Sequence, residues 1–445
     1  MKATFGNSFA KRSLVIAATA LPSLYSGLAS AQAAPPAPAP APAAVPAPAP
    51  VAAPAPAPAP EPAPVTTPAP AVVAEPAANP VAPLPAPAPE PPPAPTDPDA
   101  EKYKHISMGI WNRTTFTVQG TNPKKLNHIG VGGEMELNFS NQMRKAVAWT
   151  ANLVASYGPN DGGSFATGGA GITGTAGILD LIAQFEPDPA FNVWVGRMLV
   201  ASDRSNFSGP YFMAPWVYPL FIGPQGAPYA VVGPKEGPSG RNDGATVWGQ
   251  VQGGMFKYYL GVYNLYDAAN KPLISGRLAL SLLNPEPGYY GSSTYYGKDI
   301  LALGVGGQYQ KNGDKYAAAS DGLADYGLFL ADLLFEKDLQ ASGVVDVEGA
   351  FYKYIGDGQA MKASYMALAS YLTPDTGVGK FQPLVRIQQA MMKDSAGGNT
   401  ATMIDAQVGY VVDSYSTRFA LGYSHGSDGG SAKSNAVFAG VQLQK

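Results

Sequence analysis

Residues 422–426, Gly-Tyr-Ser-His-Gly, have the type and spacing of a chemical site. They match the G-x-S-x-G pattern, in which a serine nucleophile sits on a sharp turn between a strand and a helix. That chemistry also needs an acid and a histidine later in the chain. Here a glycine-rich stretch follows Ser424, and His425 is the last histidine. We therefore do not expect the serine to be catalytic.

A second motif, Gly169-Ala170-Gly171-Ile172-Thr173-Gly174, matches the G-x-G-x-x-G pattern of dinucleotide-binding turns. It lies in a glycine-rich stretch with no strand before it and no helix after it, so we interpret its glycines as loop residues. The chain has no cysteine and three scattered histidines, at positions 105, 128 and 425. Thiolate metal sites and disulfides are excluded, and we predict no metal, no cofactor and no enzyme activity.

The overall charge argues against a nucleic-acid partner. Only 14% of the residues are charged, and the formal net charge is −3. A chain that binds nucleic acid usually carries a strongly basic patch, which a nearly neutral chain does not provide. We expect no nucleic-acid partner.

The first 31 residues have the layout of a secretory signal. Lys11 and Arg12 supply a positive flank, and Ser13–Leu21 is a short apolar run. Ala29-Ser30-Ala31 is a small-residue cleavage site. The signal peptide is therefore predicted over residues 1–31, which implies export to the cell envelope or beyond.

Residues 32–100 form a segment of a different composition. Positions 33–100 hold 27 prolines and 25 alanines, with no glycine, aromatic residue, lysine or arginine. Such a chain cannot bury a core, and proline opposes both helix and sheet. We predict a disordered, extended linker. A tether that contacts the cell wall is the second interpretation, and the composition does not separate the two.

From residue 101 onward the dominant pattern is strand alternation. In His128–Ser140, Ile129, Val131, Met135, Leu137 and Phe139 alternate with small or polar residues that include Glu134 and Glu136. Successive side chains on a strand point to opposite faces, so this strand has one apolar face. About sixteen such segments of about ten residues follow one another up to residue 445, and that is the length a tilted strand needs to cross a bilayer.

The recurrence predicts an all-β fold for residues 101–445, a transmembrane antiparallel barrel of about sixteen strands. A soluble β-sandwich is the alternative. Short connections such as 140–142, 252–254 and 413–415 and long ones such as 158–174, 285–298 and 393–400 suggest one rim of turns and one rim of loops. Tyrosines near the ends of the apolar faces are typical of a membrane interface: Tyr157, Tyr263, Tyr309, Tyr365, Tyr371 and Tyr410.

The longest connection, Ala201–Asp243, is rich in aromatic residues and proline, which indicates a packed structure. Three positions are open to it: folded into the lumen, capping the outer mouth, or packed in a subunit contact. Opposed charges at a constriction would sort solutes by charge. The candidate pore-lining or constriction residues are Glu134, Glu136, Arg197, Asp203, Arg204, Arg241, Arg277, Asp346, Glu348, Arg386 and Asp405.

The domain resembles bacterial outer-membrane porins, loosely the phosphate-selective O/P type. The resemblance is carried by Asn192–Gly209 (NVWVGRMLVASDRSNFSG), Pro285–Gly297 and Asp332–Leu339. It implies a sixteen-stranded barrel, commonly trimeric, that lets small solutes diffuse across the outer membrane of a Gram-negative-type bacterium. Anion-selective members line the pore with many basic residues, whereas acidic residues accompany the arginines here. Phosphate selectivity is therefore not carried over.

The leading hypothesis is an outer-membrane porin with a water-filled channel for passive diffusion of small hydrophilic solutes or ions. Its expected partners are outer-membrane lipid and two further copies of itself. The alternative is a structural or adhesive envelope protein, in which the barrel is an anchor and residues 33–100 contact the cell wall. In either case the apolar side chains of His128–Ser140 are expected to face lipid, and its glutamates to face the lumen.

Overall fold

The computed structural model describes residues 103, 105–120, 128–159, 172–218, 221–222, 228–230, 235, 240–264, 271–314, 324–356, 359–430 and 433–445. The predicted signal peptide and the predicted Pro/Ala linker lie outside the described residues. The start of the glycine motif, at 169–171, lies outside them too.

Within the described residues, sixteen antiparallel strands form a closed barrel, which confirms the predicted fold class and strand count. Their bounds are β1 Ser107–Gly120, β2 His128–Arg144, β3 Val147–Pro159, β4 Ile172–Asp188, β5 Phe191–Leu199, β8 Arg241–Val251, β9 Phe256–Asn264, β10 Leu273–Ser281, β11 Ile300–Asp314, β12 Ala324–Asp338, β13 Val344–Ile355, β14 Met361–Leu372, β15 Lys380–Met392, β16 Thr400–Asp413, β17 Thr417–Ser427 and β18 Lys433–Gln444. The alternating segment His128–Ser140 lies within one of these strands, β2.

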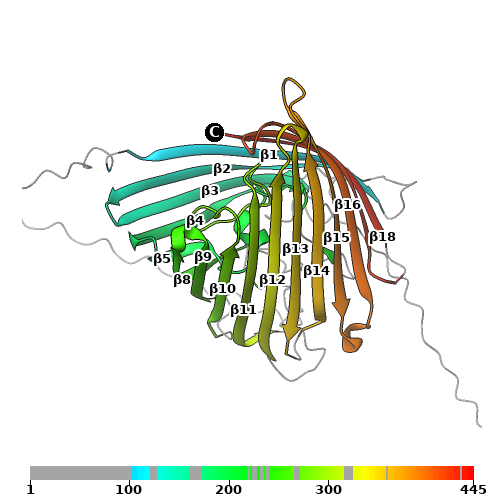
Figure 1. Cartoon of the computed structure of the whole chain (residues 1–445). Helices are drawn as coiled ribbons and strands as arrows, with labels where there is room; N and C mark the ends of the chain where they lie inside the picture. The colour runs from blue at the N-terminus through cyan, green and yellow to red at the C-terminus, as the bar shows by residue number, and fades with distance from the viewer. Residues whose placement is uncertain are drawn as a thin grey trace, which may run out of the picture. The chain divides into compact units, whose positions relative to one another are not determined.

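The ring closes where the first strand meets the last (Figure 1). β1 pairs with β2 on one side and with β18 on the other, with Trp111 opposite Gln444 in the second pair. Closure leaves no unpaired sheet edge among the strands of the described ring, so each has a partner on both sides. The remaining elements of the described chain are short: α2 Arg204–Ser208, a separate hairpin of β6 Phe221–Ile222 and β7 Pro228–Ala230, and the 3-10 turns η3 Gln252–Gly254, η4 Gln340–Ser342 and η5 Asp394–Ala396.

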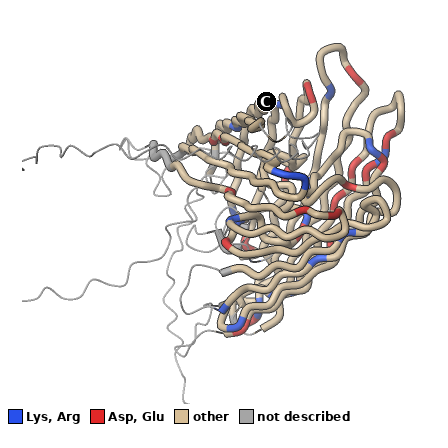
Figure 2. Tube along the Cα trace, turned by 90° about the vertical axis from the view of Figure 1, so that its left-hand side faces the viewer, with Lys and Arg blue, Asp and Glu red and all other residues tan. Residues whose placement is uncertain are grey.

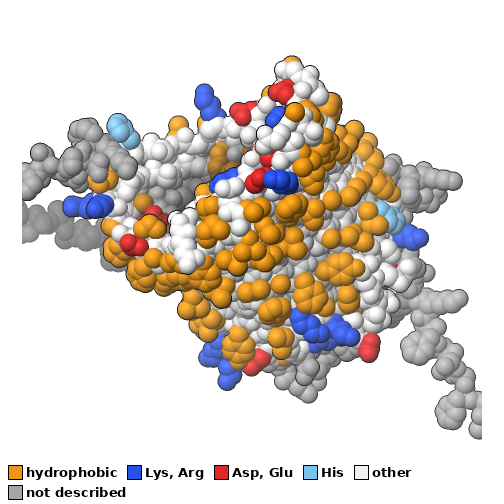
Figure 3. Space-filling model, in the orientation of Figure 1, with side chains coloured by type: hydrophobic (Ala, Val, Ile, Leu, Met, Phe, Trp, Pro, Cys, Tyr) orange, Lys and Arg blue, Asp and Glu red, His pale blue; other side chains and the backbone are white. Residues whose placement is uncertain are grey.

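The two faces of the ring differ sharply in polarity. On β2, Ile129, Val131 and Met135 are 53%, 37% and 41% exposed, whereas Glu136 is 3% exposed on the inner face. β12 repeats the pattern, with Phe329 and Leu333 exposed and Asp332 and Glu336 buried. Figure 3 shows apolar side chains spread over the outward surface of the visible strands, with charged groups toward the edges. No helix in the described part of the chain is long and apolar enough to cross a membrane.

Two connections differ from what the sequence predicted. Because neighbouring strands are antiparallel, connections alternate between a rim that holds the start of β1 and the end of β18, here called the terminal rim, and the opposite loop rim. Residues 282–299 join β10 to β11 at the terminal rim, beside the tight turns. They were expected among the long loops of the other rim. Residues 140–142, expected as a turn, continue β2, and the turn falls at Lys145 and Ala146.

One predicted interface tyrosine points the other way. Tyr309 and Tyr157 are 47% and 37% exposed on the outer face, but Tyr263 is 1% exposed and points inward. Its hydroxyl accepts a hydrogen bond from the backbone N–H of Ala201, 2.9 Å away, and lies 2.6 Å from the hydroxyl of Thr246. Tyr263 therefore belongs to the packing of the barrel interior.

Candidate functional site in the barrel interior

The described first half of the β5–β8 connection, residues 200–218, runs through the barrel, the first of the three positions that the sequence left open. We call its residues 200–218 the crossing segment. Its first residues hydrogen-bond to β9 and β10, and its last residues to β1 and β16. β9 and β10 stand six or seven places from β1 and β16 in the ring of sixteen, so these attachments lie on nearly opposite walls. The crossing segment therefore spans the lumen from wall to wall.

The near end of the crossing segment is held by polar side chains of the wall. Ser275 donates to the carbonyl of Ala201, and Arg277 donates to the carbonyl of Ser202 at 3.3 Å. Asp203 caps α2 by accepting from the backbone N–H of Asn206 at 3.1 Å, and it also accepts from the hydroxyl of Tyr352 on β13. An aspartate at this position satisfies backbone groups that the helix leaves free. The wall thereby fixes where α2 begins.

The far end is anchored by Trp216. Its indole N–H donates to Thr115 Oγ1 at 2.9 Å, and its backbone N–H donates to Gln407 Oε1 at 2.7 Å. The guanidinium of Arg113 lies 4.1 Å from the centre of the ring, and that of Arg418 lies 5.5 Å away. Cations over an indole face are attracted by its negative π surface. Trp216 is 3% exposed, so it is a buried anchor on the β1–β18 wall.

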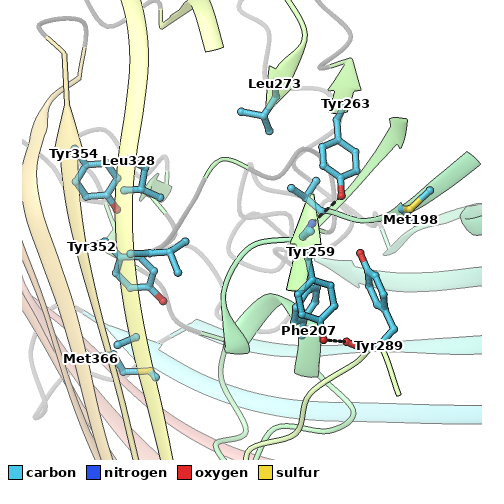
Figure 4. Packing of buried hydrophobic residues seen from close by; sticks show 14 of the residues in the cluster. Met198, Phe207, Tyr259, Tyr263, Leu273, Tyr289, Leu328, Tyr352, Tyr354 and Met366 are labelled. Atoms are coloured by element: carbon cyan, nitrogen blue, oxygen red, sulfur yellow. Dashed lines mark hydrogen bonds between the residues drawn. The ribbon is translucent and has the colours of Figure 1, made fainter. Parts of the chain in front are cut away.

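Residues 282–299, here called the inserted segment, enter the barrel from the terminal rim. Glu336 on β12 binds the part of the segment that leads back to β11. Its carboxylate accepts hydrogen bonds from Thr294 Oγ1 at 2.9 Å and from the backbone N–H groups of Gly297 and Lys298 at 2.7 and 2.6 Å. Tyr289 stacks on Trp194 with ring centres 4.3 Å apart. Figure 4 shows Tyr289 beside Phe207 and Tyr259, with Tyr259 hydrogen-bonded to it.

The two segments, which come from opposite rims, meet at an ion pair. The guanidinium of Arg204 donates to both carboxylate oxygens of Glu286, at 2.5 and 2.8 Å, and to the carbonyl of Ser292 at 3.0 Å. Both side chains are buried. Two parallel hydrogen bonds between a guanidinium and a carboxylate make a strong and directional contact.

Glu286 lies in a connection, outside the spanning strands. Burial opposes its ionisation, but Arg204 and the hydroxyl of Tyr295 outweigh burial and lower the pKa of Glu286 from 4.5 to about 2. A depressed carboxylate pKa contributes stability that is present above 4.5 and is lost as the pH falls through about 2. The Arg204–Glu286 pair is therefore intact across the neutral and mildly acidic range.

Further ion pairs line the inner wall, and charges of both signs are interspersed along the chain (Figure 2). Arg277 pairs with Asp332 through both nitrogens of its fork, one of them 2.8 Å from Oδ1. Arg241 lies 3.2 Å from both oxygens of Asp180. Arg386 pairs with Asp405 at 2.8 Å. These three pairs contain four of the sequence candidates, and only Arg386 and Asp405 pair with each other.

Asp203 and Arg204 lie in the crossing segment, and the remaining candidates fall into two groups. Glu134, Glu136, Asp346 and Glu348 lie on the inner face, where Asp346 accepts from Ser370 Oγ at 2.9 Å. Arg197 lies outside: it is opposite Leu181 and Asp243 in the strand register, and both of those side chains are exposed. The glycine at position 196 has φ +133°, and Arg197 reaches the carbonyl of Ile178 at 3.2 Å. The role of the inward residues as pore-lining charges stays a prediction.

The list of candidate site residues left out several interior residues. Asp180, Asp332, Glu336 and Arg418 all sit at inward positions of strands, so the phase of the alternation was the signal that pointed to them. Glu286 had no such signal, because it lies in a connection without alternation. The aromatic set around Tyr289 was likewise missed, since Trp194 and Trp248 occur on separate strands and only the fold brings them together.

The serine motif lies inside a strand. Ser424 is in the body of β17 and donates to Asp405 Oδ1 at 2.5 Å. His425, the next residue, contacts Asn435 through Nδ1 at 2.9 Å. A nucleophile elbow needs a strand-to-helix turn at the serine, whereas β17 runs on to Ser427. Ser424 is therefore part of the Arg386–Asp405 network of the wall.

Comparison with known proteins points to one class of fold. No protein-family model matches the sequence, and no curated protein matches it. The structure of Pseudomonas putida OprB at high pH is similar, with a TM-score of 0.51 and 9% sequence identity over 77% of this chain and 94% of that chain. Salmonella typhi OmpF in complex with daunomycin has a TM-score of 0.50 and 11% identity over 76% of this chain and 97% of that one.

The barrel has the fold of outer-membrane porins. At these identities the likeness concerns the fold alone, and the solute and mechanism are argued from the residues of this chain.

Proposed function

We propose that the chain is an outer-membrane porin that lets small hydrophilic solutes or ions diffuse passively through its barrel. One observation carries the proposal: a closed ring of sixteen strands has an apolar outer face and a polar, charged inner face. Lipid offers no hydrogen bonds, so only a closed barrel or helices satisfy every backbone group in a bilayer. An inverted polarity of this kind suits lipid outside and water inside.

Current recordings in planar bilayers test the proposal. The purified, folded chain is expected to add discrete, stepwise conductance, because each inserted barrel adds one aqueous path. Material purified in the same way from cells that lack the chain is the control. A chain that inserts into the bilayer and yet passes no current would contradict the proposal.

The inner charges do not favour the phosphate-selective type. Among the described inward residues, Arg204, Arg241, Arg277 and Arg386 each pair with a carboxylate. Paired arginines offer an anion less attraction than free ones, because the carboxylate has already neutralised them. We therefore propose a general path for small hydrophilic solutes and ions, without phosphate selectivity.

The apolar outer face supports a place in the outer membrane, and a charge placed on it tests that location. Val385, in the middle of β15, is 58% exposed, and Val378, in the β14–β15 turn, is 75% exposed. Val385→Arg is expected to cost about 2–4 kcal/mol of stability in a bilayer, whereas the same change beyond the apolar belt costs far less. Refolding into lipid vesicles at graded urea concentrations measures both variants. Equal midpoints for Val385→Arg and Val378→Arg would place β15 in water.

The remaining partners stay proposals. The outer face contacts lipid in this account, and three copies of the chain are expected to associate. The anchor hypothesis depends on residues 33–100, which lie outside the described residues. Deleting that segment separates the two hypotheses: loss of cell-wall association with conductance intact would add a tethering role to the pore.

A further inference from the structure

We propose that the inserted segment is a gate, which rests against the crossing segment with Arg204–Glu286 as its latch and leaves the lumen when the pore opens fully. The proposal rests on the proposed channel function. It concerns a segment that enters from the terminal rim, at a position where the neighbouring strand pairs are joined by short turns.

The two segments are attached in different ways, which identifies the moving one. The crossing segment is bound at both ends to opposite walls, by Ser275 and Arg277 on one side and by Thr115 and Gln407 on the other. The inserted segment leaves the wall after Ser281 and returns to the adjacent strand at Ile300. Wall side chains, Glu336 on β12 and Tyr415 in the β16–β17 turn, hold it without strand pairing, so it can withdraw toward its own rim while the crossing segment stays fixed.

The base of the inserted segment is strained in the inserted position. Tyr296 has φ +59° and Asp299 has φ +43°, which is the left-handed region that side chains avoid. Gly297, between them, has φ +114°. Non-glycine residues in this region cost free energy and persist only where surrounding contacts hold them. The contacts of Glu336 with Gly297 and Lys298 hold this conformation, and full withdrawal of the segment would release the strain.

The tip is held by contacts that water can replace. Glu286 pairs with Arg204, the ammonium of Lys257 donates to the carbonyl of Gly288 at 2.7 Å, and the backbone N–H of Ser293 donates to the carbonyl of Phe212 at 3.0 Å. Desolvating two charges cancels much of the attraction between them. Withdrawal hydrates both groups, so a buried ion pair makes a reversible latch. Tyr289 packs against Trp194 and Phe207 and fixes where the tip seats.

A reversible cross-link tests the gate directly. A Cβ on Gly291 would lie 3.5 Å from the Cβ of Phe207, within the range of about 3.5–4.5 Å found in disulfides. The natural chain has no cysteine, so Phe207→Cys with Gly291→Cys allows one disulfide and no other. The oxidised variant is expected to stay at a small conductance level, and reduction of the same channels is expected to restore the larger level. Because one population is compared before and after reduction, a folding defect cannot produce the difference.

A single substitution tests the role of the Arg204–Glu286 pair as the latch, and a matched substitution elsewhere serves as its control. Glu286→Gln removes the bidentate carboxylate of Arg204 in the closed state and leaves it, among the described residues, only Asp332 as an ion-pair partner, at 3.8 Å. The ratio of large to small openings is expected to rise about tenfold. Asp375→Asn makes the matching change at an exposed carboxylate in the β14–β15 turn of the terminal rim, where it accepts from the backbone N–H of Gly377, and should leave the ratio as it is. Wild-type chain with reductant controls for the reagent.

The outcomes separate this inference from the proposed function. Equal conductance in the oxidised and reduced double variant, or an unchanged opening ratio in Glu286→Gln, would overturn the gate while leaving the channel. No current from the wild type or from any variant would overturn both.

Discussion

Replacing Trp216 with alanine is expected to release the far end of the crossing segment and to raise single-channel conductance severalfold. The indole fills a site between Arg113 and Arg418 and donates to Thr115. Its loss removes the largest apolar contact of that end, and substitutions of this size cost about 3–5 kcal/mol in protein cores. Conductance steps in planar bilayers and the thermal midpoint of the folded barrel measure the two effects.

A glycine on the wall, Gly440, gives a second way to displace the indole of Trp216. A Cβ on Gly440 would lie 2.1 Å from a ring carbon of Trp216, so Gly440→Ala should push the indole from its seat and mimic Trp216→Ala. In the Trp216→Ala background the same change should have little further effect. Gly349→Ala adds a Cβ with no neighbour nearer than 3.7 Å and should behave as wild type. Additive effects of the two main changes would show that the seat lies elsewhere.

Replacing Arg277 with alanine is expected to destabilise the barrel by about 3–5 kcal/mol, the cost of removing one partner of a buried ion pair. Asp332 would be left in the interior with Arg204 as its nearest cation, at 3.8 Å. The change also removes the hydrogen bond to Ser202, so the near end of the crossing segment loses one of its attachments. Urea-dependent unfolding from lipid vesicles gives the loss of free energy.

Two further variants check that the ion pair causes this loss. Combining Arg277→Ala with Asp332→Ala should recover part of the stability, because no buried charge is then left alone. Gly304→Ala should resemble Arg277→Ala, since a Cβ there would lie 2.2 Å from the Arg277 guanidinium. Lys337→Ala breaks the exposed Lys337–Asp299 pair and should change little, because water screens it. A double variant less stable than Arg277→Ala would contradict this account.

The strands could be predicted from the sequence because lipid forces one face of each to be apolar over its whole spanning length. The segments around Ile129, Phe329 and Val385 all show this alternation, and all lie in strands. The rule weakens at strand ends, where water and packed loops replace lipid. Tyr263 was misplaced for that reason, since an inward tyrosine with a bonded hydroxyl has the same sequence appearance as one at a membrane interface.

The site was less predictable. The position of the inserted segment was available in principle, because counting strands from the turn at 252–254 places residues 282–299 on the same rim. The length of a connection does not show on which rim it lies, so the long 285–298 connection was assigned to the wrong rim. The partners of the charged candidates could not be predicted without the register of the strand pairs. Arg386 and Asp405, for example, pair because they stand opposite each other in the β15–β16 ladder. Glu286 gave no signal, because its partner lies 82 residues earlier in another connection.

The closure of the ring through β1 and β18 has a consequence for how the molecule folds. Trp111 and Gln444 pair across nearly the whole domain, so this seam forms between the earliest and the latest strands of the barrel. Trp216 is seated against the same seam, by Thr115 on β1 and Gly440 on β18. A partly assembled sheet has no seat for this side chain, and pairings distant in sequence form slowly. We therefore expect pairing of β1 with β18 and docking of the crossing segment to occur as one cooperative event, which the fluorescence of Trp216 would follow.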